Sequence, residues 1–211
     1  MLSGVILAGG PNRGMNGEHK AFLLLDHRTL IERQIGEMRR CCSEIIIVTN
    51  DPGLFLRAVE RDIRIITDYF PGKGPLSGMH AGLTLAQNPA VWVVSCDMPF
   101  ISAAAAVLLQ SKLEQGLEAV VPFIGRRPHP FHGVFGKSGA PSLAALLEQE
   151  KPVPEDWLNR LHWGQVPEQT FREHGIGCRF VEAIDTREDY ESLSSSFNSP
   201  SVKAEELRLE L

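Results

Sequence analysis

This sequence has few of the features that mark membrane proteins or nucleic-acid-binding proteins. No apolar run approaches the roughly 20 residues that a membrane-spanning helix needs, and the first residues lack the charged segment of a signal peptide. The 21 Lys and Arg residues are outnumbered by 26 Asp and Glu, and they form no basic cluster. We therefore expect a cytoplasmic protein that binds neither a membrane nor nucleic acid.

Cysteine is also scarce. The four cysteines are Cys41, Cys42, Cys96 and Cys178, and none of them has Cys-x-x-Cys or another metal-binding spacing. This distribution predicts reduced thiols rather than a disulfide framework. The composition that remains, 43% apolar and 22% charged over 211 residues, is that of an ordinary globular protein with one large domain or two small ones.

Strand and helix patterns alternate through the first half of the chain. Short apolar runs predict strands at 2–8, 44–49, 63–67, 91–95 and 119–122. Helical spacing predicts helices at 29–40, 54–61, 76–87 and 102–115, the last with Ser102 as N-cap. This order favours an α/β fold, a three-layer α/β/α, Rossmann-like arrangement around a mostly parallel, twisted sheet.

The second half of the chain is less regular. We expect strands at 131–135 and 178–184, a helix at 142–150, and a helix at 186–193 that opens with a Thr-x-x-Asp cap. The serine-rich stretch from residue 194 predicts a linker followed by a terminal tail. The chain is thus expected to form a single domain over residues 1–193, with 194–211 as linker and tail.

A glycine-rich loop follows the first predicted strand. Gly9 and Gly10 come directly after the apolar run, further glycines follow, and Lys20 comes before the chain turns apolar again. Free backbone N–H groups in such a loop can surround a polyphosphate, and a lysine adds positive charge. The spacing matches neither a Walker loop nor a dinucleotide fingerprint. A phosphate-binding loop and an ordinary mobile surface loop both remain open on this pattern.

Polar residues follow three further strands at the edge where parallel sheets bind ligands. Asn50 and Asp68 come after the second and third strands, and Asp97 comes after the fourth. Asp97 suits Mg²⁺, which takes few carboxylates together with phosphates and water, but it also suits capping of the next turn. The segment 74–78 has the same two interpretations, ligand contact or ordinary helix entry.

Three blocks of residues together resemble the MobA-like family of molybdenum cofactor guanylyltransferases, a branch of the sugar-nucleotidyltransferase-like superfamily. The blocks are Leu7-Ala8-Gly9-Gly10 with Met15 and Lys20, then Thr67-Asp68 with 71–78, and finally Cys96-Asp97-Met98-Pro99-Phe100. The resemblance covers roughly residues 3–193. Weaker similarity follows at 125–130 and 183–189.

The resemblance implies transfer of GMP from Mg²⁺-bound GTP to the terminal phosphate of molybdopterin, with release of pyrophosphate. It implies Asp97 as metal ligand and Lys20, Asp97 and Arg13 as catalytic residues. The nucleotide-binding residues that it implies are Leu7, Ala8, Gly9, Gly10, Lys20, Asn50, Asp68 and Gly78. The partners are then GTP and molybdopterin or its molybdenum form, with transient contacts to other cofactor-assembly proteins because this substrate is labile.

The first loop departs from the family pattern. The family has Arg-Met-Gly and then Asp-Lys, where this chain has Gly14-Met15-Asn16 and His19-Lys20. Arg13 lies one residue before the place of the missing arginine. Three hypotheses follow: a guanylyltransferase that uses Arg13, a related enzyme for CTP or another small phosphate acceptor, and a catalytically weak nucleotide- or cofactor-binding protein. His129 and His132 suit either pterin contact or a surface or core role.

Overall fold

The computed structural model describes residues 1–10, 17–149 and 152–197. The strands are β1 (Leu2–Leu7), β2 (Leu24–Leu25), β3 (Arg28–Thr29), β4 (Cys42–Val48), β5 (Arg64–Ile66), β6 (Ala90–Ser95), β7 (Ala119–Ile124), β8 (Arg127–Pro128), β9 (His132–Gly136) and β10 (Trp163–Pro167). The α-helices are α1 (Leu30–Met38), α2 (Pro52–Phe55), α3 (Pro75–Leu85), α4 (Ala103–Leu113), α5 (Ala140–Leu147), α6 (Pro154–Leu158), α7 (Glu168–Glu173) and α8 (Arg187–Phe197). The 3₁₀ helices are η1 (Lys20–Phe22), η2 (Lys137–Gly139) and η3 (Cys178–Val181).

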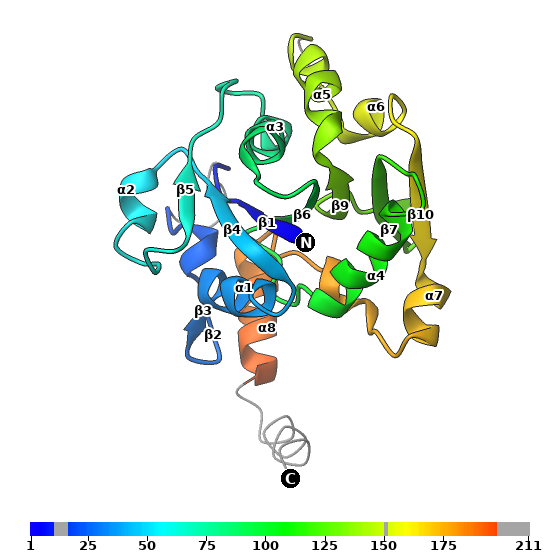
Figure 1. The fold of residues 1–211 in the computed structure, drawn as a ribbon. Helices are drawn as coiled ribbons and strands as arrows, with labels where there is room; N and C mark the ends of the chain where they lie inside the picture. Colours follow the sequence, from blue (N-terminus) through cyan, green and yellow to red (C-terminus); the bar gives the residue numbers. More distant parts are fainter. Residues whose placement is uncertain (11–16, 150–151, 198–211) are drawn as a thin grey trace.

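One eight-stranded sheet forms the centre of the molecule, in the order β10-β7-β9-β6-β1-β4-β5 with β8 paired to β7. β1 pairs in parallel with both β4 and β6, whereas β9 runs antiparallel to β6 and β7. Helices cover both faces of this sheet (Figure 1). The predicted α/β fold with a mostly parallel sheet is confirmed.

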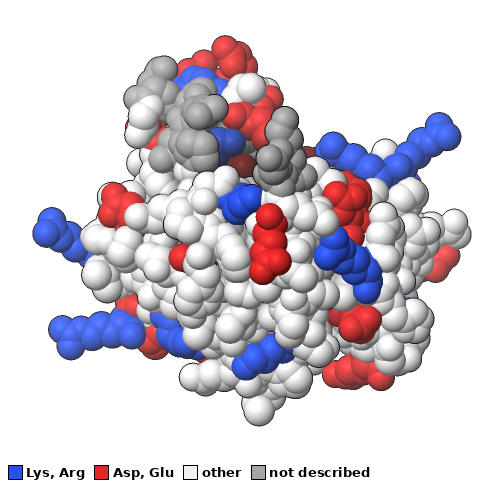
Figure 2. All heavy atoms as spheres, turned by 90° about the horizontal axis from the view of Figure 1, so that it is seen from above, with Lys and Arg blue, Asp and Glu red and all other residues white. Residues whose placement is uncertain are grey.

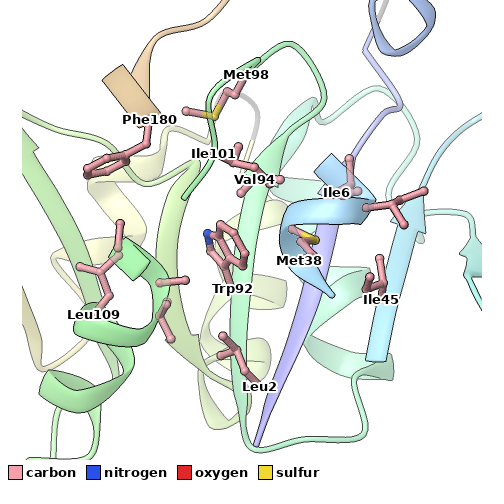
Figure 3. Close-up of a cluster of buried hydrophobic side chains, with 14 of the residues drawn as sticks. Leu2, Ile6, Met38, Ile45, Trp92, Val94, Met98, Ile101, Leu109 and Phe180 are labelled. Atoms are coloured by element: carbon pink, nitrogen blue, oxygen red, sulfur yellow. The ribbon is translucent and has the colours of Figure 1, made fainter. Parts of the chain in front are cut away.

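Each face of the sheet has its own apolar core, because alternate side chains of a strand point to opposite faces. Ile6 and Trp92 lie in one core with Met38 of α1 and Leu109 of α4 (Figure 3). Val5, Leu7 and Val93 lie in the other core with α3 and α5. Gly82 lets α3 approach closely, since a Cβ there would lie 2.7 Å from Val5 Cγ1.

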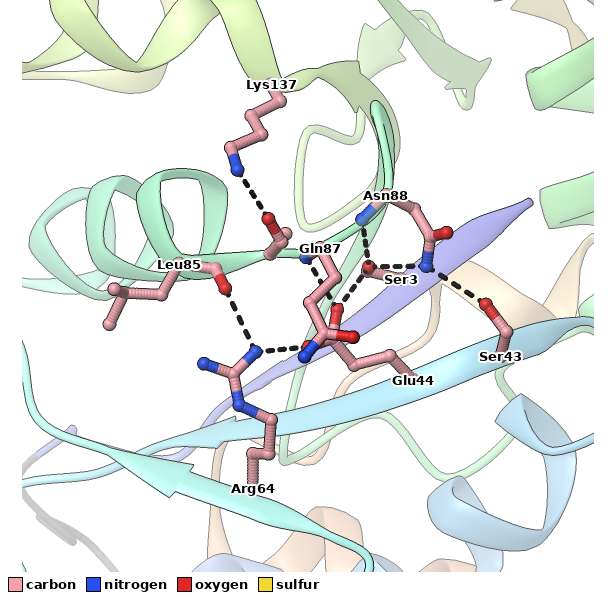
Figure 4. Close-up of polar contacts among 9 residues, drawn as sticks. Ser3, Ser43, Glu44, Arg64, Leu85, Gln87, Asn88 and Lys137 are labelled. Carbon is pink, nitrogen blue, oxygen red and sulfur yellow. Dashed lines mark hydrogen bonds and ion pairs between the residues drawn. The ribbon is translucent and has the colours of Figure 1, made fainter.

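The buried carboxylate of Glu44 joins the amino ends of β1 and β4 to the chain around them (Figure 4). Glu44 accepts hydrogen bonds from Ser3 Oγ at 2.5 Å and from the Gln87 N–H at 2.9 Å, and it pairs with Arg64. Burial raises the pKa of Glu44, but these hydrogen bonds and the charge of Arg64 outweigh it and hold the pKa below its usual value. This carboxylate links the two strands to the segment that leads into β6, at the edge opposite the glycine-rich loop.

Two sequence-based predictions were wrong in the last part of the chain. The stretch 178–184 does not form a strand: Cys178–Val181 is a 3₁₀ helix whose Phe180 packs on His132 and Phe171. The linker does not begin at residue 194 either, because α8 continues through Phe197. Serines inside this last turn return hydrogen bonds to helix carbonyls, and Phe197 stacks on Phe100.

Several helix boundaries follow the predicted capping residues. Ser102 Oγ accepts from the Ala105 N–H at the start of α4, as predicted. Thr186 and Asp189 exchange hydrogen bonds at the start of α8, which confirms the Thr-x-x-Asp cap. The predicted helix at 54–61 is shorter than expected, since only Pro52–Phe55 is helical.

The surface carries charges of both signs. Figure 2 shows Lys and Arg scattered together with Asp and Glu among uncharged side chains on that face. Within the described ranges, no helix has the length and apolarity that a membrane crossing requires.

His132 lies in the core rather than at the surface. It is fully buried, its ring packs against Trp92 and Phe180, and its Nε2 accepts from the Ser102 N–H at 3.2 Å. Burial lowers its pKa to about 3. The core alternative for His132 is therefore confirmed, and this histidine is neutral at physiological pH.

The buried His132 predicts a loss of stability in mild acid. Between about pH 6.5 and the folded pKa of about 3, the unfolded chain binds a proton that the folded chain does not. The free energy of unfolding should thus fall by about 2 kcal/mol from this residue between about pH 7 and about pH 5. Urea denaturation at both pH values measures this change. His132→Gln keeps a hydrogen-bond acceptor but cannot titrate. Its free energy of unfolding should therefore fall by about 2 kcal/mol less between the two pH values. An equal fall in both proteins would contradict this effect of His132.

Candidate active site

Three parallel strands end side by side, and this places their following loops together. Leu7 of β1 lies in register with Val48 of β4 and Ser95 of β6. The pairing continues past the strand ends, since the Ala8 N–H donates to Val48 O at 2.8 Å and the Cys96 N–H donates to Leu7 O at 3.0 Å. The loops after β1, β4 and β6 therefore start from one edge of the sheet, where α/β sheets bind ligands.

The glycine-rich loop begins with a close contact to the loop after β4. Asn50 Nδ2 donates to Gly9 O at 2.8 Å, and a Cβ on Gly9 would lie 3.2 Å from that nitrogen. Glycine at this position allows the contact without displacing Asn50. Gly10 is exposed, whereas Leu7 and Ala8 are buried. Arg13 and Gly14, where the first loop departs from the family pattern, lie outside the described residues.

His19 fixes the end of the same loop against the sheet. Its Nδ1 accepts from the Ala21 N–H at 3.2 Å, so its Nε2–H donates to Ala8 O at 3.0 Å. The ring lies edge-on to Phe22 and Phe55. Burial lowers the pKa of His19, despite opposing effects of the Ala8 hydrogen bond and of Asp51. A neutral histidine thus connects the end of the loop to the end of β1.

Lys20 and Asp97 meet across the edge of the sheet, although 77 residues separate them in the chain. Lys20 Nζ lies 3.3 Å from Asp97 Oδ2, and the two side chains are only 15% and 18% exposed. Asp97 Oδ1 is buried and has no hydrogen-bond partner among the described residues. The described structure does not form the turn cap that the sequence also suggested for Asp97, so neither turn geometry nor a neighbour there occupies this oxygen.

Cys96, beside Asp97, is excluded as a nucleophile. Burial and then the charge of Asp97 raise its pKa to about 12. At physiological pH the side chain is therefore a neutral, buried thiol, and only the thiolate is strongly nucleophilic.

The second glycine-rich loop reaches the same edge from β5. Asp68 follows this strand and is half-buried. Ser77 Oγ accepts from the Phe70 N–H at 3.2 Å and holds the loop on the start of α3. Gly74, with φ of 68°, precedes Pro75 at the first position of this helix. The helix-entry interpretation is thus correct for this segment, while Asp68 stays beside the edge.

Gly78 lies beneath the site rather than on its surface. It is buried in α3, and a Cβ there would lie 3.2 Å from Leu7 Cδ2 and 3.5 Å from Val48 Cγ1. Its lack of a side chain brings α3 close to the ends of β1 and β4.

Helix α8 contacts the chain that follows the glycine-rich loop. Arg187 at the start of α8 pairs with Glu18 at 2.7 Å, and Tyr190 Oη donates to Leu24 O at 2.8 Å. Just before this helix, the Ile184 N–H donates to Asp97 O at 2.9 Å. The segment that includes Ile184 and α8 thus contacts both the chain after the first loop and the turn that contains Asp97.

Sequence reasoning missed one residue next to the site. Gln34 of α1 is fully buried and donates to the carbonyl oxygens of Ser95 and Met98. The helical spacing that singled out Ile31 and Ile35 also places Gln34 on the buried face, since it lies three residues after Ile31. The sequence signal that could have identified Gln34 was a polar residue within the apolar face of this predicted helix.

Comparison with known proteins identifies the family. The family model described as MobA-like NTP transferase domain matches residues 4–165. The chain belongs to this family. It is a nucleotidyltransferase, as predicted.

Relatives of this family member share most of their length with it. It is 28% identical over 198 residues to the molybdenum cofactor guanylyltransferase of Desulfosudis oleivorans, covering 94% of this chain and 96% of the relative. It is 30% identical over 203 residues to the probable molybdenum cofactor guanylyltransferase of Carboxydothermus hydrogenoformans, covering 93% and 97%. Among solved structures, molybdopterin-guanine dinucleotide biosynthesis protein A from Archaeoglobus fulgidus has the same fold, with a TM-score of 0.79, 22% identity, and coverage of 92% and 97%.

The contacts of His19 predict its effect on stability. His19→Ala removes two hydrogen bonds and two edge-on ring contacts, and should lower the free energy of unfolding by about 2 kcal/mol. Urea denaturation measures the change. His162→Ala is the matched control, because His162 is exposed and should cost less than about 0.5 kcal/mol. Equal effects of the two substitutions would show that His19 does not anchor the loop.

Proposed function

We propose that this protein transfers GMP from GTP to the terminal phosphate of molybdopterin, or of its molybdenum form, and releases pyrophosphate. The names of the relatives support this reaction. The structural observation that supports it most directly is the ion pair between Lys20 and Asp97. The other carboxylate oxygen of Asp97 has no partner among the described residues. The reaction is expected in the cytoplasm, with hand-over of the labile acceptor from other cofactor-assembly proteins.

The Asp97 oxygen fits a magnesium ion. Within the described residues, no group of three or more His, Cys, Asp or Glu could hold a metal by itself. Mg²⁺ does not require such a cage, because it is commonly held by one or two carboxylates together with substrate phosphates and water. Asp97 is the residue that would hold it, and the ion would neutralise charge on the triphosphate.

The remaining chemistry needs positioning and charge neutralisation rather than a covalent intermediate. An oxygen of the acceptor phosphate forms a bond to the α-phosphorus of GTP, and the bond from that phosphorus to the bridging oxygen of the β-phosphate breaks. The acceptor phosphate is already ionised near neutral pH, so no strong general base is needed. Lys20 and the N–H groups of the loop then offset the repulsion between the two anions and hold them in line.

We assign recognition of the guanine base to the loops after β4 and β5. Asp68 is half-buried and Asn50 is fixed by its bond to Gly9. A carboxylate such as that of Asp68 accepts from guanine N1–H and N2–H, which cytosine lacks. Leu7, Ala8, Gly9 and Gly10 lead into the first loop, and Gly78 brings α3 close to the ends of β1 and β4.

Pyrophosphate release with each nucleotide tests the proposal. The protein is incubated with Mg²⁺, molybdopterin or its molybdenum form, and one of GTP, CTP, ATP or UTP. Release with GTP alone, and dependent on the acceptor, supports the guanylyl reaction. Preference for CTP would support a related enzyme that uses CTP. Nucleotide binding without pyrophosphate release would indicate a carrier or regulator.

Asp97→Asn should lower the turnover rate at least a hundredfold, about 2.7 kcal/mol of barrier, because the amide is a poor ligand for Mg²⁺. Initial rates of pyrophosphate release measure this loss, and thermal unfolding checks that the fold persists. Asp62→Asn is the matched control, since Asp62 is exposed and its ion-pair partner in the described structure is Arg39. A rate near that of the unchanged protein would remove Asp97 as the metal ligand.

Arg13→Ala should lower the turnover rate at least tenfold, about 1.4 kcal/mol of barrier, if Arg13 replaces the family arginine on the triphosphate. The same rate assay applies, with Arg61→Ala as control because Arg61 is exposed and far along the chain from the loop. An unchanged rate would show that the loop binds the triphosphate without this arginine.

A further inference from the structure

Gln34 is buried where an apolar residue would be expected. It lies on α1 between Ile31 and Ile35 and has no solvent exposure. Its Oε1 has no hydrogen-bond partner among the described residues. A buried, unpaired amide oxygen costs about 1–3 kcal/mol, which offsets much of what two net hydrogen bonds of about 0.5–1.5 kcal/mol each contribute. Stability alone therefore gives little reason for an amide at this position.

The two hydrogen bonds of Gln34 have a specific arrangement. Nε2 donates to Ser95 O at 2.9 Å and to Met98 O at 2.8 Å. The Met98 N–H also donates to Ser95 O, at 3.3 Å, so residues 95–98 form a turn. Both protons of one amide thus hold the two ends of the turn that carries Asp97.

Other contacts complete the fixing of this turn. The Cys96 N–H donates to Leu7 O at 3.0 Å, and Asp97 O accepts from the Ile184 N–H at 2.9 Å. The Asp97 backbone is thereby held by β1, by the segment before α8 and, through Gln34, by α1. Its side chain then has Oδ2 beside Lys20 and Oδ1 unpartnered in the described part of the chain.

We infer that Gln34 is a positioning residue for Asp97: it fixes the 95–98 turn so that Asp97 Oδ1 is held ready for the divalent cation. This rests on the proposed function, in which Asp97 holds Mg²⁺. Gln34 does not contact the ion or the substrate. Loss of its two donors frees the carbonyls of Ser95 and Met98, and the turn can then move the carboxylate, whose placement a metal site depends on.

Binding of Mn²⁺, a paramagnetic substitute for Mg²⁺, tests this without turnover. Electron paramagnetic resonance measures free Mn²⁺ during titration of the whole protein with a GTP analogue that has a methylene group between the α- and β-phosphorus. Gln34→Met has nearly the same length and no donors. We expect it to weaken Mn²⁺ binding at least fivefold, with thermal unfolding still cooperative. Gln34→Leu also removes the donors and serves if Gln34→Met does not fold.

Ile35→Val is the matched control, because Ile35 is the next buried residue of α1 and, in the described structure, no hydrogen bond joins it to the turn. It should change the melting temperature but leave Mn²⁺ affinity unchanged. Asp97→Asn separates the two proposals. If Asp97→Asn weakens Mn²⁺ binding and Gln34→Met does not, the role of Gln34 is wrong while the proposed function stands. If Asp97→Asn has no effect, the metal role of Asp97 fails and the role of Gln34 fails with it.

Discussion

The parallel pairing of β1 with both β4 and β6 is the constraint on which the site depends. Because the three strands run in one direction, their carboxyl ends meet, and the pairing extends past them to Ala8 and Cys96. Residues far apart in sequence are brought within hydrogen-bond distance at this edge, as Asn50 is to Gly9. The buried Glu44 holds the opposite edge of the same strands, so the sheet is joined at one end and carries the polar loops at the other.

The ion pair between Lys20 and Asp97 at this end of the sheet is mostly buried. Burying two charges costs free energy, and such a pair suits a catalytic site. Lys20 and Asp97 lose most of their hydration, and an exposed pair at a similar distance would contribute little to stability. The surrounding contacts hold the two groups in place, with His19 anchoring the loop that contains Lys20 and Ile184 holding the backbone of Asp97. Charges fixed before substrate arrives need no reorganisation during transfer of a nucleotidyl group, which is a general source of rate enhancement.

The sequence was sufficient for the architecture of the first half, and it predicted which loops would follow neighbouring parallel strands. Apolar runs such as 44–49 and 91–95 are buried on both faces, so their strand character is visible without any contact information. The stretch 178–184 was also predicted to be a strand, but Cys178–Val181 forms η3, because Phe180 packs into the core while no strand of the described structure pairs with it. The serines after residue 193 suggested a linker, yet packing of Phe197 on Phe100 extends α8. Gln34 was missed because a hydrogen bond between α1 and a turn 61 residues later has no local signal.

The central claim is that Asp97 and Lys20 form the catalytic centre of a guanylyl transfer reaction at the carboxyl edge of the sheet. A crystal structure of the protein with Mn²⁺ and a GTP analogue that cannot be cleaved between the α- and β-phosphorus tests it most directly. The account predicts an anomalous-scattering peak at coordination distance from Asp97 Oδ1, with the triphosphate against Lys20 and the guanine near Asp68. Metal bound elsewhere, or a nucleotide away from this edge, would contradict it.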